Sequence, residues 1–156
     1  MNLDIVYVFF YSYFLGSIPF GLIITKLFLG KDIRNVGSGN IGTTNVLRTG
    51  KKSLALATLL LDVLKGYITV LISYKFFNEF IYFSALACFM GHIFPVWLKF
   101  KGGKGVATYL GIILGISFVF GAVFIVAWLL SVIIFRYSSL LSILGSLIVC
   151  FYSIFT

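Results

Sequence analysis

The sequence predicts an all-α fold, a polytopic bundle of transmembrane helices that forms a single integral membrane domain over residues 1–156. Of its 156 residues, 61% are hydrophobic and only 10% are charged, whereas soluble domains carry about 25% charged residues. Long apolar runs alternate with polar segments, and the basic residues gather in alternate segments. Such a chain has too little polar surface to face water on all sides, which excludes the soluble classes.

Four apolar runs are each predicted to be one helical crossing, although the last of them is short. A helix needs roughly 20 apolar residues to cross a hydrocarbon core about 30 Å thick. The first run contains the segment 16–21, Gly-Ser-Ile-Pro-Phe-Gly, whose proline is expected to kink the helix because it removes one helical hydrogen bond. The four single crossings are residues 3–29, 53–74, 78–97 and 140–155.

Residues 106–135 form a longer unbroken apolar run with two possible interpretations. One tilted helix would place Arg136 outside the cell. Two short spans, broken near Phe120 and Gly121, would return Arg136 to the cytoplasm, and the positive-inside rule favours this arrangement. The sequence therefore predicts six crossings, with five as the alternative.

Two charges, Asp62 and Lys65, interrupt the second apolar run. They are three positions apart on one helical face, so we expect them to pair. A charge near the centre of a membrane helix costs at least about 2.5 kcal/mol on insertion scales, and it usually faces a wet interior. The alternative is that the helix begins deeper in the cytoplasm and that both charges lie near the membrane interface.

The distribution of charge predicts the orientation of the chain. Its net charge is +8, and the basic residues concentrate around residues 26–52 and 99–104. By the positive-inside rule both segments are cytoplasmic and the N-terminus, which carries Asp4, lies outside. Nucleic acid is not an expected partner, because a membrane bundle leaves no broad basic surface.

The two basic segments are also rich in glycine. The first contains Gly37-Ser38-Gly39-Asn40-Ile41-Gly42-Thr43-Thr44-Asn45 and closes with Arg48, and the second is Lys101-Gly102-Gly103-Lys104-Gly105. Glycine lets several backbone N–H groups turn toward one anion, while Lys and Arg supply the opposite charge. Arg48 can hold a phosphate with two parallel N–H bonds. The second segment opens a helix, whose free N–H groups favour an anion. We therefore expect the two loops to converge on one cationic pocket beside lipid.

Other kinds of site have little support. The sequence offers no Ser–His–Asp set, no pair of acids and no cluster of metal ligands, so we expect neither a metal nor another cofactor. Cys88 and Cys150 lie in apolar runs and are interpreted as small buried hydrophobes. In an enzyme of this kind, positioning and electrostatics would supply the rate. Two alternatives are a transporter of a phosphorylated solute and a non-catalytic membrane subunit, although a transporter would usually show inverted repeats.

Four segments, in order, resemble one known family. They are GSIPFG at 16–21, DIRNVGSGNIGTTNVLR at 32–48, DVLKG at 62–66 and GHIFPVWLKFKGGKGVAT at 91–108. Together they are similar to the bacterial acyl-phosphate:glycerol-3-phosphate acyltransferases, the PlsY family. The resemblance extends from about residue 12 to residue 145.

The resemblance implies a multi-pass enzyme of the bacterial inner membrane, acting in phospholipid synthesis. It would transfer a fatty acyl group from acyl phosphate to glycerol 3-phosphate, and would release 1-acyl-glycerol 3-phosphate and phosphate. The family's essential serine and arginine fall on Ser38 and Arg48, and its glycerol 3-phosphate motif falls on residues 102–105. With Lys104, those two are the expected catalytic residues. The expected substrate-binding residues are Gly37, Gly39, Asn40, Thr43, Asn45, His92, Gly102, Gly103, Gly105, Ser139 and Ser142.

The family also has a seventh crossing and a third cytoplasmic motif with a histidine, an asparagine and a glutamate. No such motif is found in this sequence, and His92 belongs to the GHxFP segment instead. Two explanations are open, a truncated form of a longer protein or a reduced member that works with two motifs.

Overall fold

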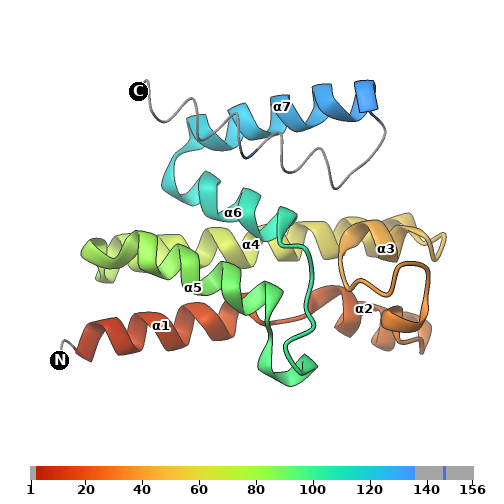
Figure 1. Ribbon diagram of the computed structural model, residues 1–156, viewed down its shortest axis with the longest axis horizontal. Helices are drawn as coiled ribbons and strands as arrows, with labels where there is room; N and C mark the ends of the chain where they lie inside the picture. Colours follow the sequence, from red (N-terminus) through yellow and green to blue (C-terminus); the bar gives the residue numbers. More distant parts are fainter. Residues whose placement is uncertain (1–2, 136–145, 147–156) are drawn as a thin grey trace.

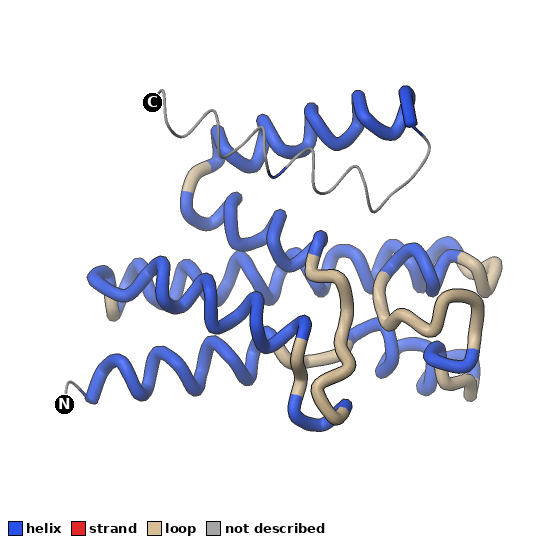
Figure 2. Tube along the Cα trace, in the orientation of Figure 1, coloured by secondary structure: helices blue, strands red, loops and turns tan. Residues whose placement is uncertain are grey.

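The computed structural model describes residues 3–135 and Ser146, with side chains to residue 130, and all regular structure in this part is helical (Figure 2). This agrees with the predicted all-α class. In chain order the elements are α1 Leu3–Gly16, α2 Phe20–Leu29, η1 Ile33–Asn35, α3 Thr43–Leu47, α4 Lys52–Phe76, η2 Asn78–Phe80, α5 Ile81–Ile93, η3 Val96–Leu98, α6 Val106–Ile116 and α7 Phe118–Phe135.

The first apolar run is divided into two helices, where the sequence predicted a kink. α1 ends at Gly16 and α2 begins at Phe20, so three residues separate them. Pro19 lies directly before α2, where its lack of an N–H is tolerated. Trp97 Nε1 donates to the Ser17 carbonyl at 2.8 Å and satisfies a group that the break leaves free. The break is thus held by a side chain from the segment that follows α5.

α4 is the central helix of the bundle, and α1, α2, α3, α5 and α6 all contact it. α6 lies beside it (Figure 1), and glycines of each helix pack against the backbone of the other. A Cβ at Gly66 would overlap the Thr108 carbonyl oxygen, and a Cβ at Gly111 would overlap that of Val63. Small residues of this kind let membrane helices approach each other at backbone distance.

The long apolar run at 106–135 forms two helices that fold back on each other (Figure 1). The break is at Ser117, a few residues before the predicted position at Phe120 and Gly121. Ser117 has an extended backbone, and its N–H still bonds the Ile113 carbonyl at 2.8 Å. The two-helix interpretation of this run is therefore confirmed. The last expected crossing, 140–155, lies outside the described residues except for Ser146, so the number of crossings stays a prediction.

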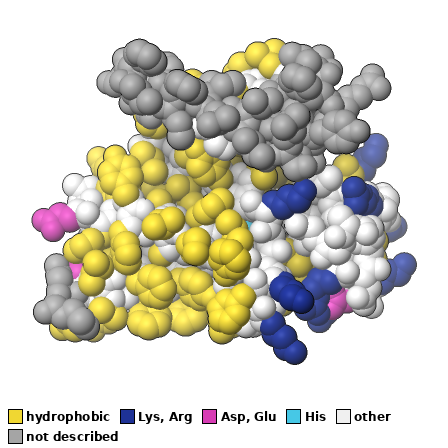
Figure 3. Space-filling view, viewed as in Figure 1, with side chains coloured by type: hydrophobic (Ala, Val, Ile, Leu, Met, Phe, Trp, Pro, Cys, Tyr) yellow, Lys and Arg dark blue, Asp and Glu magenta, His cyan; other side chains and the backbone are white. Residues whose placement is uncertain are grey.

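The outer surface is suited to lipid over most of its length. Large apolar side chains such as those of Phe118 and Tyr82 are 78% and 76% exposed. Within the described residues, three segments are long and apolar enough to cross a membrane, namely Leu3–Leu29, Lys52–Phe76 and Asn78–Leu98. Figure 3 shows hydrophobic side chains over the larger part of one face, with Lys and Arg gathered toward one end. That end carries α2, α3 and both glycine-rich loops (Figure 1).

Candidate active site

The two glycine-rich loops line one cavity of about 460 Å³, as the sequence predicted. The first loop contributes lining residues of the cavity from the turn before α3 and from α3 itself. The second loop contributes lining residues at the start of α6. Its lining consists of Ser38, Asn40, Gly42, Thr43, Thr44, Asn45, Arg48, Leu59, Asp62, His92, Lys104, Gly105, Val106, Ala107, Leu110, Phe124, Ile125, Trp128 and Leu129.

Asn45 holds the first loop in shape. Its buried side-chain oxygen accepts the backbone N–H of Ser38 at 3.0 Å. Its amide nitrogen donates to the carbonyls of Val36 and Asn40, both at 2.8 Å, and of Ile33 at 3.0 Å. Because both ends of the amide are engaged within the loop, Asn45 positions Ser38 at the cavity.

Asp32 organises the start of the first loop, away from the cavity. Its carboxylate caps η1 by accepting the Arg34 backbone N–H at 3.0 Å, and it pairs with the Arg34 guanidinium at 2.6 Å. This hydrogen bonding holds the pKa of the Asp32 carboxyl well below its ordinary value. The guanidinium of Arg34 is therefore engaged, and Arg48 is the cation of the described first loop that lines the cavity.

The second loop packs its two middle glycines against the end of α5. The N–H of Gly102 bonds the Ile93 carbonyl at 2.9 Å, and that of Gly103 bonds the His92 carbonyl at 3.1 Å. A Cβ at Gly103 would overlap the His92 ring at Nε2. These glycines therefore allow a close approach of the backbone, while Lys104 presents an exposed ammonium at the cavity.

A buried ionic cluster lies below the loops. Lys65 Nζ contacts Asp62 Oδ1 at 2.7 Å, and the two side chains are 2% and 4% exposed, respectively. The same ammonium donates to the Ile18 carbonyl at 2.8 Å and lies 2.9 Å from His92 Nδ1. The predicted pairing of Asp62 and Lys65 is confirmed, and the pair is buried among the helices. The depth of the pair in the membrane stays a prediction.

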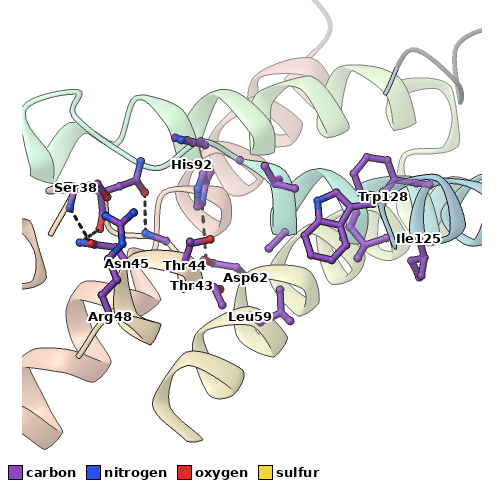
Figure 4. Close-up of a pocket in the computed structure, with 18 of the residues that line it drawn as sticks. Ser38, Thr43, Thr44, Asn45, Arg48, Leu59, Asp62, His92, Ile125 and Trp128 are labelled. Atoms are coloured by element: carbon purple, nitrogen blue, oxygen red, sulfur yellow. Dashed lines mark hydrogen bonds and ion pairs between the residues drawn. The ribbon is translucent and has the colours of Figure 1, made fainter. Parts of the chain in front are cut away.

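The other end of the cavity is apolar. Figure 4 shows Ser38, Asn45 and Arg48 at one side, His92 and Asp62 in the middle, and Trp128 and Ile125 at the far side. Its apolar lining comes from α4, α6 and α7 and consists of Leu59, Val106, Ala107, Leu110, Phe124, Ile125, Trp128 and Leu129. The cavity is thus cationic and polar at one end and suited to a hydrocarbon chain at the other.

The structure separates the sequence-predicted residues into three groups. Those that line the cavity are Ser38, Asn40, Thr43, Asn45, Arg48, His92, Lys104 and Gly105. Those in the loops but outside the lining are Gly37, Gly39, Gly102 and Gly103. Ser139 and Ser142 lie outside the described residues.

Two parts of the lining were not predicted from the sequence. Asp62 was singled out as a charge that interrupts an apolar run, which was the available signal, but it was not predicted as part of the site. The apolar residues of α7 gave no signal, since every face of that run is hydrophobic. In residues 3–135 and 146, no group of three or more His, Cys, Asp or Glu side chains is placed to hold a metal ion.

Comparison with known proteins identifies the family. The family model for glycerol-3-phosphate acyltransferase matches residues 6–156. The chain belongs to the glycerol-3-phosphate acyltransferase family. The glycerol-3-phosphate acyltransferase of Pelagibacter ubique is 57% identical over 143 residues, which cover 92% of this chain and 75% of that protein. The enzyme of the same name from Mesorhizobium japonicum is 52% identical over 149 residues, which cover 96% of this chain and 76% of that protein.

Solved structures of this acyltransferase family share the fold. Crystal structures of PlsY, an integral membrane glycerol 3-phosphate acyltransferase, match this chain in two forms. The glycerol 3-phosphate form has a TM-score of 0.89 at 41% identity, covering 96% of this chain and 76% of that one. The lysophosphatidic acid form has a TM-score of 0.87 at 38% identity, covering 96% of this chain and 75% of that one. The predicted family and the helical membrane fold are therefore confirmed, and the chain is an acyltransferase.

Proposed function

We propose that this acyltransferase moves a fatty acyl group from acyl phosphate to glycerol 3-phosphate, in the synthesis of phospholipids. The products are 1-acyl-glycerol 3-phosphate (lysophosphatidic acid) and inorganic phosphate. The observation that carries this proposal is the polarity of the cavity, with Arg48 and Lys104 at one end and apolar side chains at the other. Both substrates are phosphate anions, and one of them carries a hydrocarbon tail.

The polar end supplies the groups that bind phosphate. Arg48 offers two parallel N–H donors, and Lys104 offers a compact positive charge. The backbone of Ser38 is fixed by Asn45, so its exposed hydroxyl faces the cavity from a defined position. Thr43 Oγ1 is buried in the lining and has no hydrogen-bond partner among the described residues, so its hydroxyl is free to bind a ligand.

The reaction requires one bond to form and one to break. The hydroxyl oxygen of glycerol 3-phosphate attacks the acyl carbonyl carbon, and the bond from that carbon to the phosphate oxygen of acyl phosphate breaks. The hydroxyl proton passes to the departing phosphate, whose second pKa is about 6, close to the pH at which a base must work. Arg48 and Lys104 stabilise the negative charge that develops.

The two substrates would reach the cavity from different phases. The basic loops support an orientation with both loops in the cytoplasm and the N-terminus outside, in a bacterial inner membrane. Glycerol 3-phosphate would then enter from water at the loops. The tail of acyl phosphate would enter between α4, α6 and α7, where the lining is apolar.

The experiment is an assay of purified protein in detergent with labelled glycerol 3-phosphate and one acyl donor at a time. Palmitoyl phosphate is expected to give labelled lysophosphatidic acid, while palmitoyl-CoA and palmitoyl acyl carrier protein give none. Product from a thioester donor alone would contradict the proposed donor. Absence of product from every donor would contradict the proposed activity of this chain.

A further inference from the structure

Asp62 and His92 lie where the polar and apolar halves of the cavity meet (Figure 4), and the buried Lys65 contacts both of them. We propose that Lys65 fixes the tautomer of His92, and that His92 Nε2–H donates a hydrogen bond to the acyl carbonyl oxygen during transfer. The inference rests on the proposed acyl transfer and assigns two roles within it. His92 is a catalytic residue, and Lys65 is a positioning residue.

The contacts of Lys65 determine which nitrogen of His92 carries the proton. An ammonium has three N–H donors and no acceptor. Lys65 Nζ donates to the Ile18 carbonyl at 2.8 Å, lies 2.9 Å from His92 Nδ1 and forms an ion pair with Asp62 Oδ1 at 2.7 Å. His92 Nδ1 must therefore accept, and in a neutral imidazole the proton then resides on Nε2.

The Nε2 edge of His92 is directed away from this cluster. It lies against Gly103, where a side chain would overlap it, and the described part of the chain provides no hydrogen-bond partner for it. His92 is only 4% exposed, yet it lines the cavity. Because Nε2 is not fully enclosed by the described residues and has no partner among them, its N–H is suited to an oxygen of the bound substrate.

The position of His92 indicates which oxygen that is. Ser38 and Arg48 lie on one side of it, where the phosphates would bind, and Trp128 lies on the other, beside the hydrocarbon tail (Figure 4). The acyl carbonyl joins phosphate to tail in acyl phosphate, so it falls between these two regions. Its oxygen gains negative charge as the glycerol hydroxyl attacks, and a fixed donor stabilises that charge.

The same contacts argue against His92 as a general base. Its Nδ1 lone pair accepts from Lys65, and Nε2 already holds a proton, so neither nitrogen has a free lone pair toward the cavity. Asp62, the other carboxylate or imidazole in the described lining, is held in an ion pair with the Lys65 ammonium. The cluster therefore supplies a donor, while the proton of the glycerol hydroxyl goes to the leaving phosphate.

Two substitutions of His92 separate donation at Nε2 from other roles. His92→Gln keeps an amide N–H near the position of Nε2, whereas His92→Asn keeps only a group near Nδ1. With palmitoyl phosphate, we expect His92→Asn to lower kcat by about 100-fold, the usual loss for one oxyanion donor, with little change in the KM for glycerol 3-phosphate. His92→Gln should recover at least a tenth of the wild-type kcat, with a pH profile of wild-type shape.

Lys65→Met tests the positioning role, with Lys75→Met as the matched control on the exposed end of the same helix. We expect Lys65→Met to lower kcat like His92→Asn, while Lys75→Met stays within twofold of wild type. Nitrogen-15 NMR of labelled histidine reports the tautomer directly, because His92 is the sole histidine in the sequence. The wild type should show protonated Nε2, and Lys65→Met should show a mixture of tautomers.

Several results would overturn the inference without touching the proposed function, provided that the wild type forms lysophosphatidic acid. They are a higher KM with unchanged kcat in His92→Asn, equal losses in the Asn and Gln variants, and a wild-type NMR signal of protonated Nδ1. If Lys65→Met does not fold, the two His92 variants and the wild-type spectrum still decide. A wild type without activity on any donor would instead contradict the proposed function.

Discussion

Arg48 and Lys104 both present cations to the cavity, but they differ in how they hold an anion. A guanidinium offers a planar pair of donors that matches two phosphate oxygens, whereas an ammonium acts as a point charge. Neither the Arg48 guanidinium nor the Lys104 ammonium has a salt-bridge partner among the described residues. The Arg34 guanidinium, in contrast, pairs with Asp32. The sequence predicted both residues, because an Arg and a Lys in glycine-rich loops are typical of phosphate binding.

Replacing Arg48 by Lys should lower kcat/KM by about 10- to 100-fold, because a second hydrogen bond to a charged group is worth about 1.5–3 kcal/mol. The measurement is steady-state transfer to glycerol 3-phosphate from palmitoyl phosphate. Arg34→Lys is the matched control, since it makes the same change outside the cavity and should leave kcat/KM within twofold. A normal rate for Arg48→Lys would remove Arg48 from the site.

Asp32 predicts how the stability of the first loop depends on pH. Its folded pKa lies below its ordinary value of 3.8 because of its hydrogen bonds with Arg34. The stability that it contributes is therefore present above pH 3.8 and is lost as the pH falls through the folded pKa. Asp32→Asn should lower the Tm at neutral pH and flatten its decline in acid. Thermal unfolding in detergent checks this, and parallel acid curves for both proteins would contradict it.

At the scale of elements, the apolar runs predicted where helices occur, but not how they break or pack. Pro19 indicated an interruption in the first run, and the structure shows a complete break there. In the run at 106–135 the break falls at Ser117 and not at the predicted Phe120 and Gly121. A uniformly apolar run has no pattern from which the position of a break could be predicted. The glycines of α4 and α6 were visible in the sequence, but their contact depends on the register of the two helices.

Gly111→Ala tests the contact between α4 and α6. Helix propensity alone would make this change stabilising by about 1 kcal/mol. The new Cβ would overlap the Val63 carbonyl oxygen, so we expect a loss of about 1–3 kcal/mol from overpacking. Thermal unfolding in detergent measures the sign, and a higher Tm would show that the helices do not approach as described.

At the scale of the whole molecule, the candidate active site lies at one end of a helical bundle whose outer surface is suited to lipid. The fold shared with the two PlsY structures, at TM-scores of 0.89 and 0.87, covers 96% of this chain. Segments distant in the sequence, the first loop, the middle of α4, the end of α5 and the start of α6, meet at one cavity. This arrangement brings the loops and the apolar tail region within reach of one amphipathic ligand.

The orientation of the bundle can be tested by cysteine labelling in a Cys88→Ala, Cys150→Ala background. Lys51→Cys and Lys101→Cys, one in each basic segment, should react with a membrane-impermeant maleimide only after cells are permeabilised. Glu79→Cys, between α4 and α5, should react in intact cells. Labelling of the two lysine positions from outside would reverse the proposed orientation.

The sequence by itself determined the membrane class, the helical fold, the family and the two loops, because apolar length, charge asymmetry and glycine-rich motifs are local properties. Only the tertiary structure showed that the Asn45 side chain binds the backbone N–H of Ser38, and that Gly103 packs against the His92 ring. It also showed that Lys65 contacts Ile18, Asp62 and His92 together. These roles depend on which backbone breaks and helix faces meet, and that is decided by packing between segments far apart in the chain.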